Sequence, residues 1–218
     1  MAKRFELLIF DWDGTLMDSA AAIVASIQES CRDLGLPVPD RERAAHVIGL
    51  GLKDALSYAV PELPPADYGK LAERYRHHYL ARDPDIELFP GMREMLDGLK
   101  KRGYLLAVAT GKSRVGLNRA LEATQLKPFF DCSRCADETH SKPHPAMLQE
   151  LMQELLIEPE ATLMIGDTAH DLQMAMSAGV HALAVSYGAH TRESLTCFNP
   201  LACIGTPQDL APWLEKNA

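Results

Sequence analysis

Short apolar runs alternate with amphipathic segments along most of the chain. The runs Glu6–Phe10, Tyr104–Ala109, Thr162–Ile165 and Ala182–Val185 have the length and composition of buried strands. Helical spacing of apolar residues follows in Gly91–Lys101, Ser113–Thr124, Pro145–Leu156 and His170–Ala178. Gly103 and Gly179 stand where helices commonly end. This alternation predicts an α/β fold with a doubly wound, mostly parallel, Rossmann-like sheet.

One long stretch breaks the alternation. Residues 17–87 contain no convincing strand. The pattern there predicts three or four helical segments, over Ala20–Leu34, over Arg41–Val60 after an N-cap at Asp40, and over Asp67–Ala81. We therefore expect a small helical domain at 17–87, inserted into an α/β domain made of 1–16 and 88–218.

Composition narrows the classes of function. The chain has 218 residues and a formal net charge of −8, from 22 Lys and Arg against 30 Asp and Glu. An acidic balance argues against nucleic-acid binding, which needs clustered Lys and Arg. The apolar run Leu7–Phe10 is too short for a signal peptide or a membrane span. With five cysteines and no secretory signal, we expect reduced thiols and a cytoplasmic protein without membrane contact.

Candidate chemistry begins at the end of the first predicted strand. Asp11 and Asp13 are two residues apart, and functional side chains collect at the carboxyl ends of strands in open α/β sheets. Two such carboxylates need a proton or a cation to coexist, and their hard oxygens suit Mg²⁺. Asp18 or Ser19 is expected to cap the helix that follows.

The segment Asp11-Trp12-Asp13-Gly14-Thr15-Leu16 resembles the first motif of the haloacid dehalogenase superfamily. Three further motifs of that family follow in order: Thr110 and Gly111 after the second predicted strand, Lys142 before a proline, and the acidic pair Asp167 and Asp171 after a third strand. The set resembles the phosphoglycolate phosphatase-like branch in particular, whose helical cap would correspond to residues 17–87.

The resemblance implies roles for these residues. Asp11 would be the nucleophile that forms an aspartyl-phosphate, and Asp13 would be the general acid and base. Thr110, Gly111 and Lys142 would bind the phosphate. Mg²⁺ would be held by Asp11, Asp13 through its backbone carbonyl, and Asp167, with Asp171 behind them or as an alternate ligand.

The residue at position 13 bears on the reaction type. An Asp there is typical of family members that cleave phosphate monoesters, whose leaving group needs a proton. We expect hydrolysis of a small phosphorylated metabolite, with phosphoglycolate as the best single candidate. Sugar phosphates, nucleoside monophosphates and pyrophosphate stay open. A sugar phosphomutase and a non-catalytic regulatory protein are the alternatives. The expected partner is a small phosphate ester, and the expected state is a monomer or homodimer.

The inserted segment carries a glycine-rich loop, Ile48-Gly49-Leu50-Gly51-Leu52-Lys53, which resembles the specificity loop of the family's cap. Lys53 or His46 is a candidate contact for the part of the substrate away from the phosphate, although a solvated Lys is an equally good interpretation. Cys132 and Cys135 form a C-x-x-C pattern, which we interpret as structural thiols because no second ligand pair has zinc-site spacing.

Overall fold

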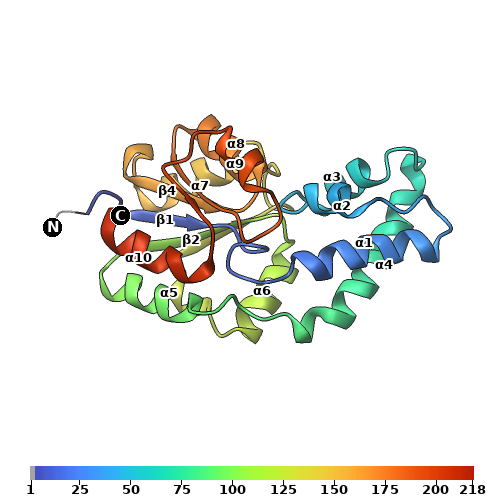
Figure 1. Cartoon of the computed structure of the whole chain (residues 1–218), viewed down its shortest axis with the longest axis horizontal. Coiled ribbons are helices and arrows are strands. Elements are labelled where there is room, and N and C mark those ends of the chain that lie inside the picture. Colours follow the sequence, from blue (N-terminus) through green and yellow to red (C-terminus); the bar gives the residue numbers. More distant parts are fainter. Residues whose placement is uncertain (1–2) are drawn as a thin grey trace.

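A six-stranded parallel sheet lies at the centre of the computed structural model, which describes residues 3–218 (Figure 1). Its strand order is β3-β2-β1-β4-β5-β6, with every neighbouring pair parallel. The strands are β1 (Leu7–Phe10), β2 (Leu105–Thr110), β3 (Cys132–Cys135), β4 (Thr162–Gly166), β5 (His181–Val185) and β6 (Cys203–Ile204). The doubly wound parallel fold is thus confirmed. The apolar pattern missed the two short edge strands.

Strand β1 shows why this sheet is covered on both faces. All four of its residues are buried, with Leu7 and Ile9 in one hydrophobic cluster and Leu8 and Phe10 in another. Side chains alternate between the two faces of a strand, so a continuous apolar run requires helices on each side.

Those helices are α5 (Met92–Lys101), α6 (Arg114–Ala123) and α10 (Pro207–Asn217) on one face, and α7 (Ala146–Leu155), α8 (Ala169–Ala178) and α9 (Arg192–Thr196) on the other (Figure 1). Short 3₁₀ turns, η3 (Lys127–Phe129) and η4 (Pro159–Ala161), precede β3 and β4. Gly179 ends α8 in the left-handed conformation, as its position in the sequence predicts. No helix within residues 3–218 combines the length and the apolar character needed to cross a membrane.

Residues 17–87, which we call the helical block, contain α1 (Ala20–Asp33), α2 (Arg41–His46), α3 (Leu52–Ala59) and α4 (Tyr68–Arg82), with η1 (Pro65–Asp67) and η2 (Asp83–Asp85). These helices extend beyond the carboxyl ends of the strands (Figure 1). Their apolar side chains form a cluster of their own, centred on residues such as Ile27, Leu56 and Leu71. Two backbone hydrogen bonds, Asp18 N to Glu87 O (2.9 Å) and Phe89 N to Leu16 O (2.9 Å), hold the two connecting segments together.

The stretch expected to be helical over Arg41–Val60 consists of two helices, α2 and α3. Asp40 does cap α2, accepting a hydrogen bond from Arg43 N at 2.7 Å, but α2 ends at His46 and α3 begins at Leu52. Gly49 between them has φ +91, a left-handed conformation that no continuing helix contains. The break produces a loop, residues 47–51, that lies against the α/β core.

Candidate active site

The carboxyl ends of the central strands bring the predicted site residues together. Asp11 follows β1, Thr110 ends β2, and Asp167 follows β4, and all three are fully buried. Gly14 permits the close approach of the first and fourth motifs. It has φ +83, and a Cβ placed there would overlap the Asp167 carboxylate. The narrow turn after β1 therefore depends on a residue with no side chain.

Lys142 is the buried cation of the site. Its Nζ donates to Asp11 Oδ1 at 2.5 Å and to Asp171 Oδ1 at 2.6 Å, and all three side chains are completely inaccessible to solvent. Burial alone lowers the pKa of a Lys, but the Asp11 and Asp171 carboxylates outweigh it and raise the Lys142 pKa above its ordinary value. Lys142 is therefore an ammonium at neutral pH.

Asp171 serves as the fixed partner of that ammonium. Its Oδ2 accepts hydrogen bonds from Thr168 Oγ1 (2.7 Å) and Thr168 N (3.1 Å), completing a capping box at the start of α8. Both of its oxygens are therefore engaged, one by Thr168 and one by Lys142. This arrangement orients Lys142 toward Asp11.

Asp167 is held by groups from two distant segments. Thr15 Oγ1 donates to its Oδ1 at 2.8 Å, and Ala189 N donates to its Oδ2 at 2.7 Å. Burial and then the Asp171 charge raise the pKa of Asp167 to about 7. Burial likewise raises the pKa of Asp11 well above its usual value, against the opposing effect of Lys142. Burial at this site therefore disfavours the charged form of both carboxyl groups.

These carboxylates fit a divalent cation. One oxygen from each of Asp11, Asp167 and Asp171 lies within 4.8 Å of the others. Three carboxylates and the Lys142 ammonium leave two formal negative charges to be balanced in this cluster. Asp11 Oδ2 is buried and accepts no hydrogen bond within residues 3–218, which is costly for a carboxylate oxygen unless something else coordinates it. Hard oxygen donors of this kind suit Mg²⁺.

The Asp13 side chain points away from that cluster toward the helical block. Its Oδ1 accepts a hydrogen bond from Ser19 Oγ at 2.7 Å and lies 3.0 Å from Lys112 Nζ. Lys112 in turn donates to the Tyr79 hydroxyl at 2.8 Å. Ser19 does occupy the N-cap position of α1, but its hydroxyl bonds Asp13 and makes no capping bond.

The loop after β2 is pressed against the loop at 47–51. Thr110 Oγ1 accepts from Lys112 N at 3.2 Å, which turns the chain sharply at Gly111. A Cβ on Gly111 would overlap the carbonyl oxygens of Gly49 and Leu50. Gly51 N donates to Ser141 Oγ at 2.8 Å, next to Lys142. The glycine-rich loop of the helical block thus contacts the second and third motifs directly.

A cavity of about 820 Å³ lies between the helical block and the α/β core. Asp13, Gly111 and Lys112 line it from the core, and Gly49, Gly51 and Lys53 line it from the helical block. Lys53, one of the two candidate substrate contacts, is thus among the residues that line the cavity. His46, the other candidate, is not among the lining residues.

His46 instead belongs to a cluster with His170 and His190, whose ring nitrogens lie within 4.8 Å of one another. Ala169 N donates to His190 Nδ1 at 3.0 Å, so the hydrogen of that neutral ring is on Nε2. Burial lowers the pKa of His190 to about 4, which keeps the ring neutral. His190 Nε2 and His170 Nε2 lie 3.2 Å and 2.7 Å from the His46 carbonyl oxygen. The Nε2 hydrogens of both rings are directed at the His46 carbonyl oxygen, so the cluster joins α2 to the core by hydrogen bonds.

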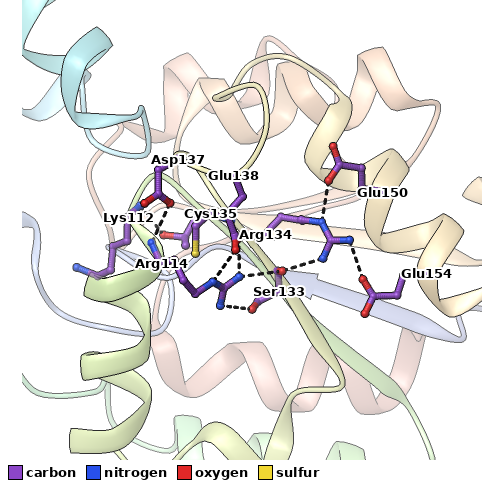
Figure 2. Close-up of polar contacts among 10 residues, drawn as sticks. Lys112, Arg114, Ser133, Arg134, Cys135, Asp137, Glu138, Glu150 and Glu154 are labelled. Atoms are coloured by element: carbon purple, nitrogen blue, oxygen red, sulfur yellow. Dashed lines mark hydrogen bonds and ion pairs between the residues drawn. The ribbon is translucent and has the colours of Figure 1, made fainter.

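The edge of the sheet next to the cavity is held by arginines. Figure 2 shows Arg114 bonding both carboxylate oxygens of Glu138 (2.9 and 2.6 Å) and Ser133 Oγ (2.8 Å). Arg134 bonds two glutamates of α7, Glu150 and Glu154, each at 2.7 Å. These contacts fix β3 and the loop after it, which also lines the cavity.

Cys132 and Cys135 lie on β3, three residues apart, so their side chains leave opposite faces of the strand. Burial raises the pKa of each thiol to about 12, which disfavours the reactive thiolate. This geometry suits packing and does not suit a redox pair.

Several site residues were not found from the sequence. Tyr79, Lys112 and the Ala189 backbone are far along the chain from the groups that they contact, which are Lys112, Asp13 and Asp167 respectively. Only Lys112 had a local signal, because it lies two residues after Thr110.

Similarity to known proteins identifies the family. The family model described as haloacid dehalogenase-like hydrolase matches residues 8–185, which include all four motifs. The chain belongs to this family. A solved structure of a hydrolase from Pseudomonas syringae, 24% identical, has the same fold, with a TM-score of 0.88 over 97% of this chain and 98% of that one.

The relatives of this family member are phosphatases by name. It is 39% identical to "Probable phosphatase IndB" of Dickeya dadantii over 92% of this chain and 89% of the relative. It is 32% identical to a phosphoglycolate phosphatase of Agrobacterium fabrum, over 84% and 81% of the two chains. It is 31% identical to pyrophosphatase PpaX of Bacillus cereus, over 97% of each. The protein is therefore an enzyme, a phosphatase of the haloacid dehalogenase-like family.

Proposed function

We propose that the protein hydrolyses small phosphate monoesters with Mg²⁺ and forms an aspartyl-phosphate on Asp11. The observation that carries this proposal is the unpartnered Oδ2 of Asp11, buried beside the Lys142 ammonium. A carboxylate oxygen in that setting is free either to attack an electrophilic phosphorus or to coordinate a metal. The cluster of Asp11, Asp167 and Asp171 supports the metal.

Each residue then has a distinct task. Asp11 attacks phosphorus, and the Asp13 carboxyl gives a proton to the departing oxygen and later removes one from the attacking water. Lys142 offsets the charge of the phosphoryl group, and Thr110 and Gly111 bind its oxygens. Asp11, Asp167 and the Asp13 backbone carbonyl would hold Mg²⁺, which supplies positive charge for the transferring phosphoryl group. Asp171 keeps Lys142 in place.

The cavity favours substrates whose leaving group is anionic. Lys53 and Arg76 both line it from the helical block, and within residues 3–218 neither side chain makes an ion pair or hydrogen bond. Phosphoglycolate has a carboxylate on its leaving group, and pyrophosphate has a second phosphate. The named relatives include a phosphatase for each. We propose phosphoglycolate as the better candidate because Asp13 can protonate an alkoxide.

A panel of phosphate esters with Mg²⁺, ranked by kcat/KM, tests the function. We expect phosphate release from phosphoglycolate and none with Asp11→Asn. Lys53→Ala should raise KM for phosphoglycolate severalfold but not for p-nitrophenyl phosphate, while Lys101→Ala, on an exposed ion pair of α5, should change neither. An Asp11→Asn enzyme as active as wild type would refute the proposal. Wild-type protein that releases phosphate from no ester of the panel would also refute it.

The same panel covers the remaining alternative. Conversion of a hexose 1-phosphate to its 6-phosphate without net release of phosphate would identify a phosphomutase instead. We also propose that residues 17–87 act as a cap domain over a core of 1–16 and 88–218, in a cytoplasmic monomer or homodimer. Light scattering and limited proteolysis near residues 17 and 87 test these assignments.

A further inference from the structure

Lys112 joins a catalytic carboxylate to the helical block. Its Nζ lies 3.0 Å from Asp13 Oδ1 and donates to the Tyr79 hydroxyl at 2.8 Å. The same ammonium lies 4.7 Å from the centre of the Tyr79 ring, within cation–π range. The Lys112 and Asp13 side chains are only 11% and 10% exposed, so water screens this pair little.

Tyr79 is itself firmly held within the helical block. It is buried on α4, and its ring stacks on Tyr75 with 5.8 Å between ring centres. The position of the Tyr79 hydroxyl therefore reports where α4 lies relative to the core. When α4 moves away from the core, Lys112 loses this hydrogen bond and its aromatic contact.

The carboxyl group of Asp13 is held through one oxygen only. Ser19 Oγ and Lys112 Nζ both contact Oδ1, and Oδ2 accepts no hydrogen bond within residues 3–218. Oδ2 is therefore the oxygen left to exchange a proton with the substrate, while the contacts at Oδ1 restrict rotation of the carboxyl group.

We propose that Lys112 is a positioning residue that holds Asp13 for proton transfer to the leaving group, and that Tyr79 makes this depend on α4 lying against the core. The proposal rests on the proposed function, in which Asp13 is the general acid. Proton transfer would then be supported only when the helical block has closed over the substrate.

The leaving group provides a selective test. An alkoxide is strongly basic and needs a proton as its bond to phosphorus breaks, whereas p-nitrophenolate leaves without one. A defect in positioning Asp13 must therefore be large for an alkyl phosphate and small for p-nitrophenyl phosphate. Because kcat/KM reports the steps up to cleavage of that bond, it isolates this effect from later hydrolysis of the phosphoenzyme.

The experiment measures kcat/KM with Mg²⁺ on the best alkyl phosphate and on p-nitrophenyl phosphate. General acid catalysis contributes on the order of 100-fold or more, so Lys112→Met should lower the alkyl phosphate value by roughly tenfold or more. The aryl value should change less than about threefold. Tyr79→Phe should act in the same direction with a smaller effect, and Lys112→Arg should recover part of the loss.

Three comparisons make the result specific. The double variant Lys112→Met/Tyr79→Phe should equal Lys112→Met, because Tyr79 acts through Lys112. His170→Leu removes a different contact between core and helical block, the hydrogen bond from His170 Nε2 to the His46 carbonyl oxygen at 2.7 Å. This variant should change kcat/KM by the same factor for both substrates. Asp13→Asn should show the leaving-group pattern in full, and thermal unfolding checks that each variant is folded.

If Lys112→Met lowers kcat/KM equally for both substrates, the proposal is overturned, because such a loss would mean that Lys112 binds the phosphoryl group. Additive effects of Lys112→Met and Tyr79→Phe would overturn the role of Tyr79. If Lys112→Met does not fold, Lys112→Gln and Tyr79→Phe provide the same comparison. If Asp13→Asn loses activity selectively on the alkyl phosphate relative to an active wild-type enzyme, while Lys112→Met does not, this proposal is rejected and the proposed function stays intact.

Discussion

The buried carboxylates should make the metal-free protein less stable as pH rises. Burial and the Asp171 charge raise the pKa of Asp167 from 3.8 to about 7, and Asp11 is shifted in the same direction. Between pH 3.8 and about pH 7, the folded protein keeps a proton on Asp167 that the unfolded chain has released. The free energy of unfolding therefore falls as the pH rises through that range. Lys142 contributes no slope there, because its pKa is raised from an already high value.

The size of the effect follows from the Asp167 shift. One group titrating differently in the two states changes the free energy of unfolding by about 1.4 kcal/mol per pH unit. From pH 5 to pH 7, the titration of Asp167 alone should then lower the free energy of unfolding by roughly 2 to 3 kcal/mol. For a chain of this size that corresponds to a fall in Tm on the order of 5 to 10 °C.

Thermal unfolding at pH 5, 6 and 7 with EDTA measures this fall, and Asp167→Asn is the matched control. The difference between wild type and Asp167→Asn isolates the contribution of this carboxyl from other titrating groups. Mg²⁺ should raise the wild-type Tm most at pH 7, because a divalent cation favours the charged carboxylates. Identical pH slopes for wild type and Asp167→Asn would refute the reasoning.

Three further outcomes are expected. Lys142→Met leaves two buried carboxylates without their cation, so it should lower the free energy of unfolding by about 3 to 5 kcal/mol in urea titrations and abolish phosphatase turnover. Gly111→Ala should push the 47–51 loop off the core, because its Cβ would overlap two loop carbonyls; kcat/KM should fall while far-ultraviolet circular dichroism is unchanged. Cys132→Ser and Cys135→Ser should keep full activity, and wild-type activity should resist thiol alkylation at pH 8, because both thiols stay protonated.

Sequence patterns predicted the elements in which local signals are strong. The apolar run at Leu7–Phe10 indicated a strand covered on both faces, and the motif after it placed Asp11 at the strand end. Apolar residues continue at helical spacing across Arg41–Val60, so their pattern did not show where α2 ends and α3 begins; the loop at Gly49 and Gly51 was identified only through the family resemblance. The strand β6 is two residues long, too short for any alternation to show.

The contacts around Asp13 could not be predicted for a different reason. Lys112 and Tyr79 are 33 positions apart, and they meet only because the helical block folds back over the ends of β1 and β2. Thr15 and Ala189 likewise reach Asp167 from opposite ends of the chain. Motifs identify residues that share chemistry, whereas the orientation of each carboxyl depends on packing between segments.

The central claim is that Asp11 carries the phosphoryl group, and chemical trapping tests it most directly. Protein quenched during turnover with Mg²⁺ and substrate is treated with borohydride, which reduces an acyl phosphate to an alcohol, and the peptides are then analysed by mass spectrometry. The account predicts homoserine at position 11, dependent on substrate and Mg²⁺, and accumulating more strongly in Asp13→Asn if that variant still forms the intermediate. An enzyme that turns over substrate while position 11 stays an unmodified aspartate would contradict it.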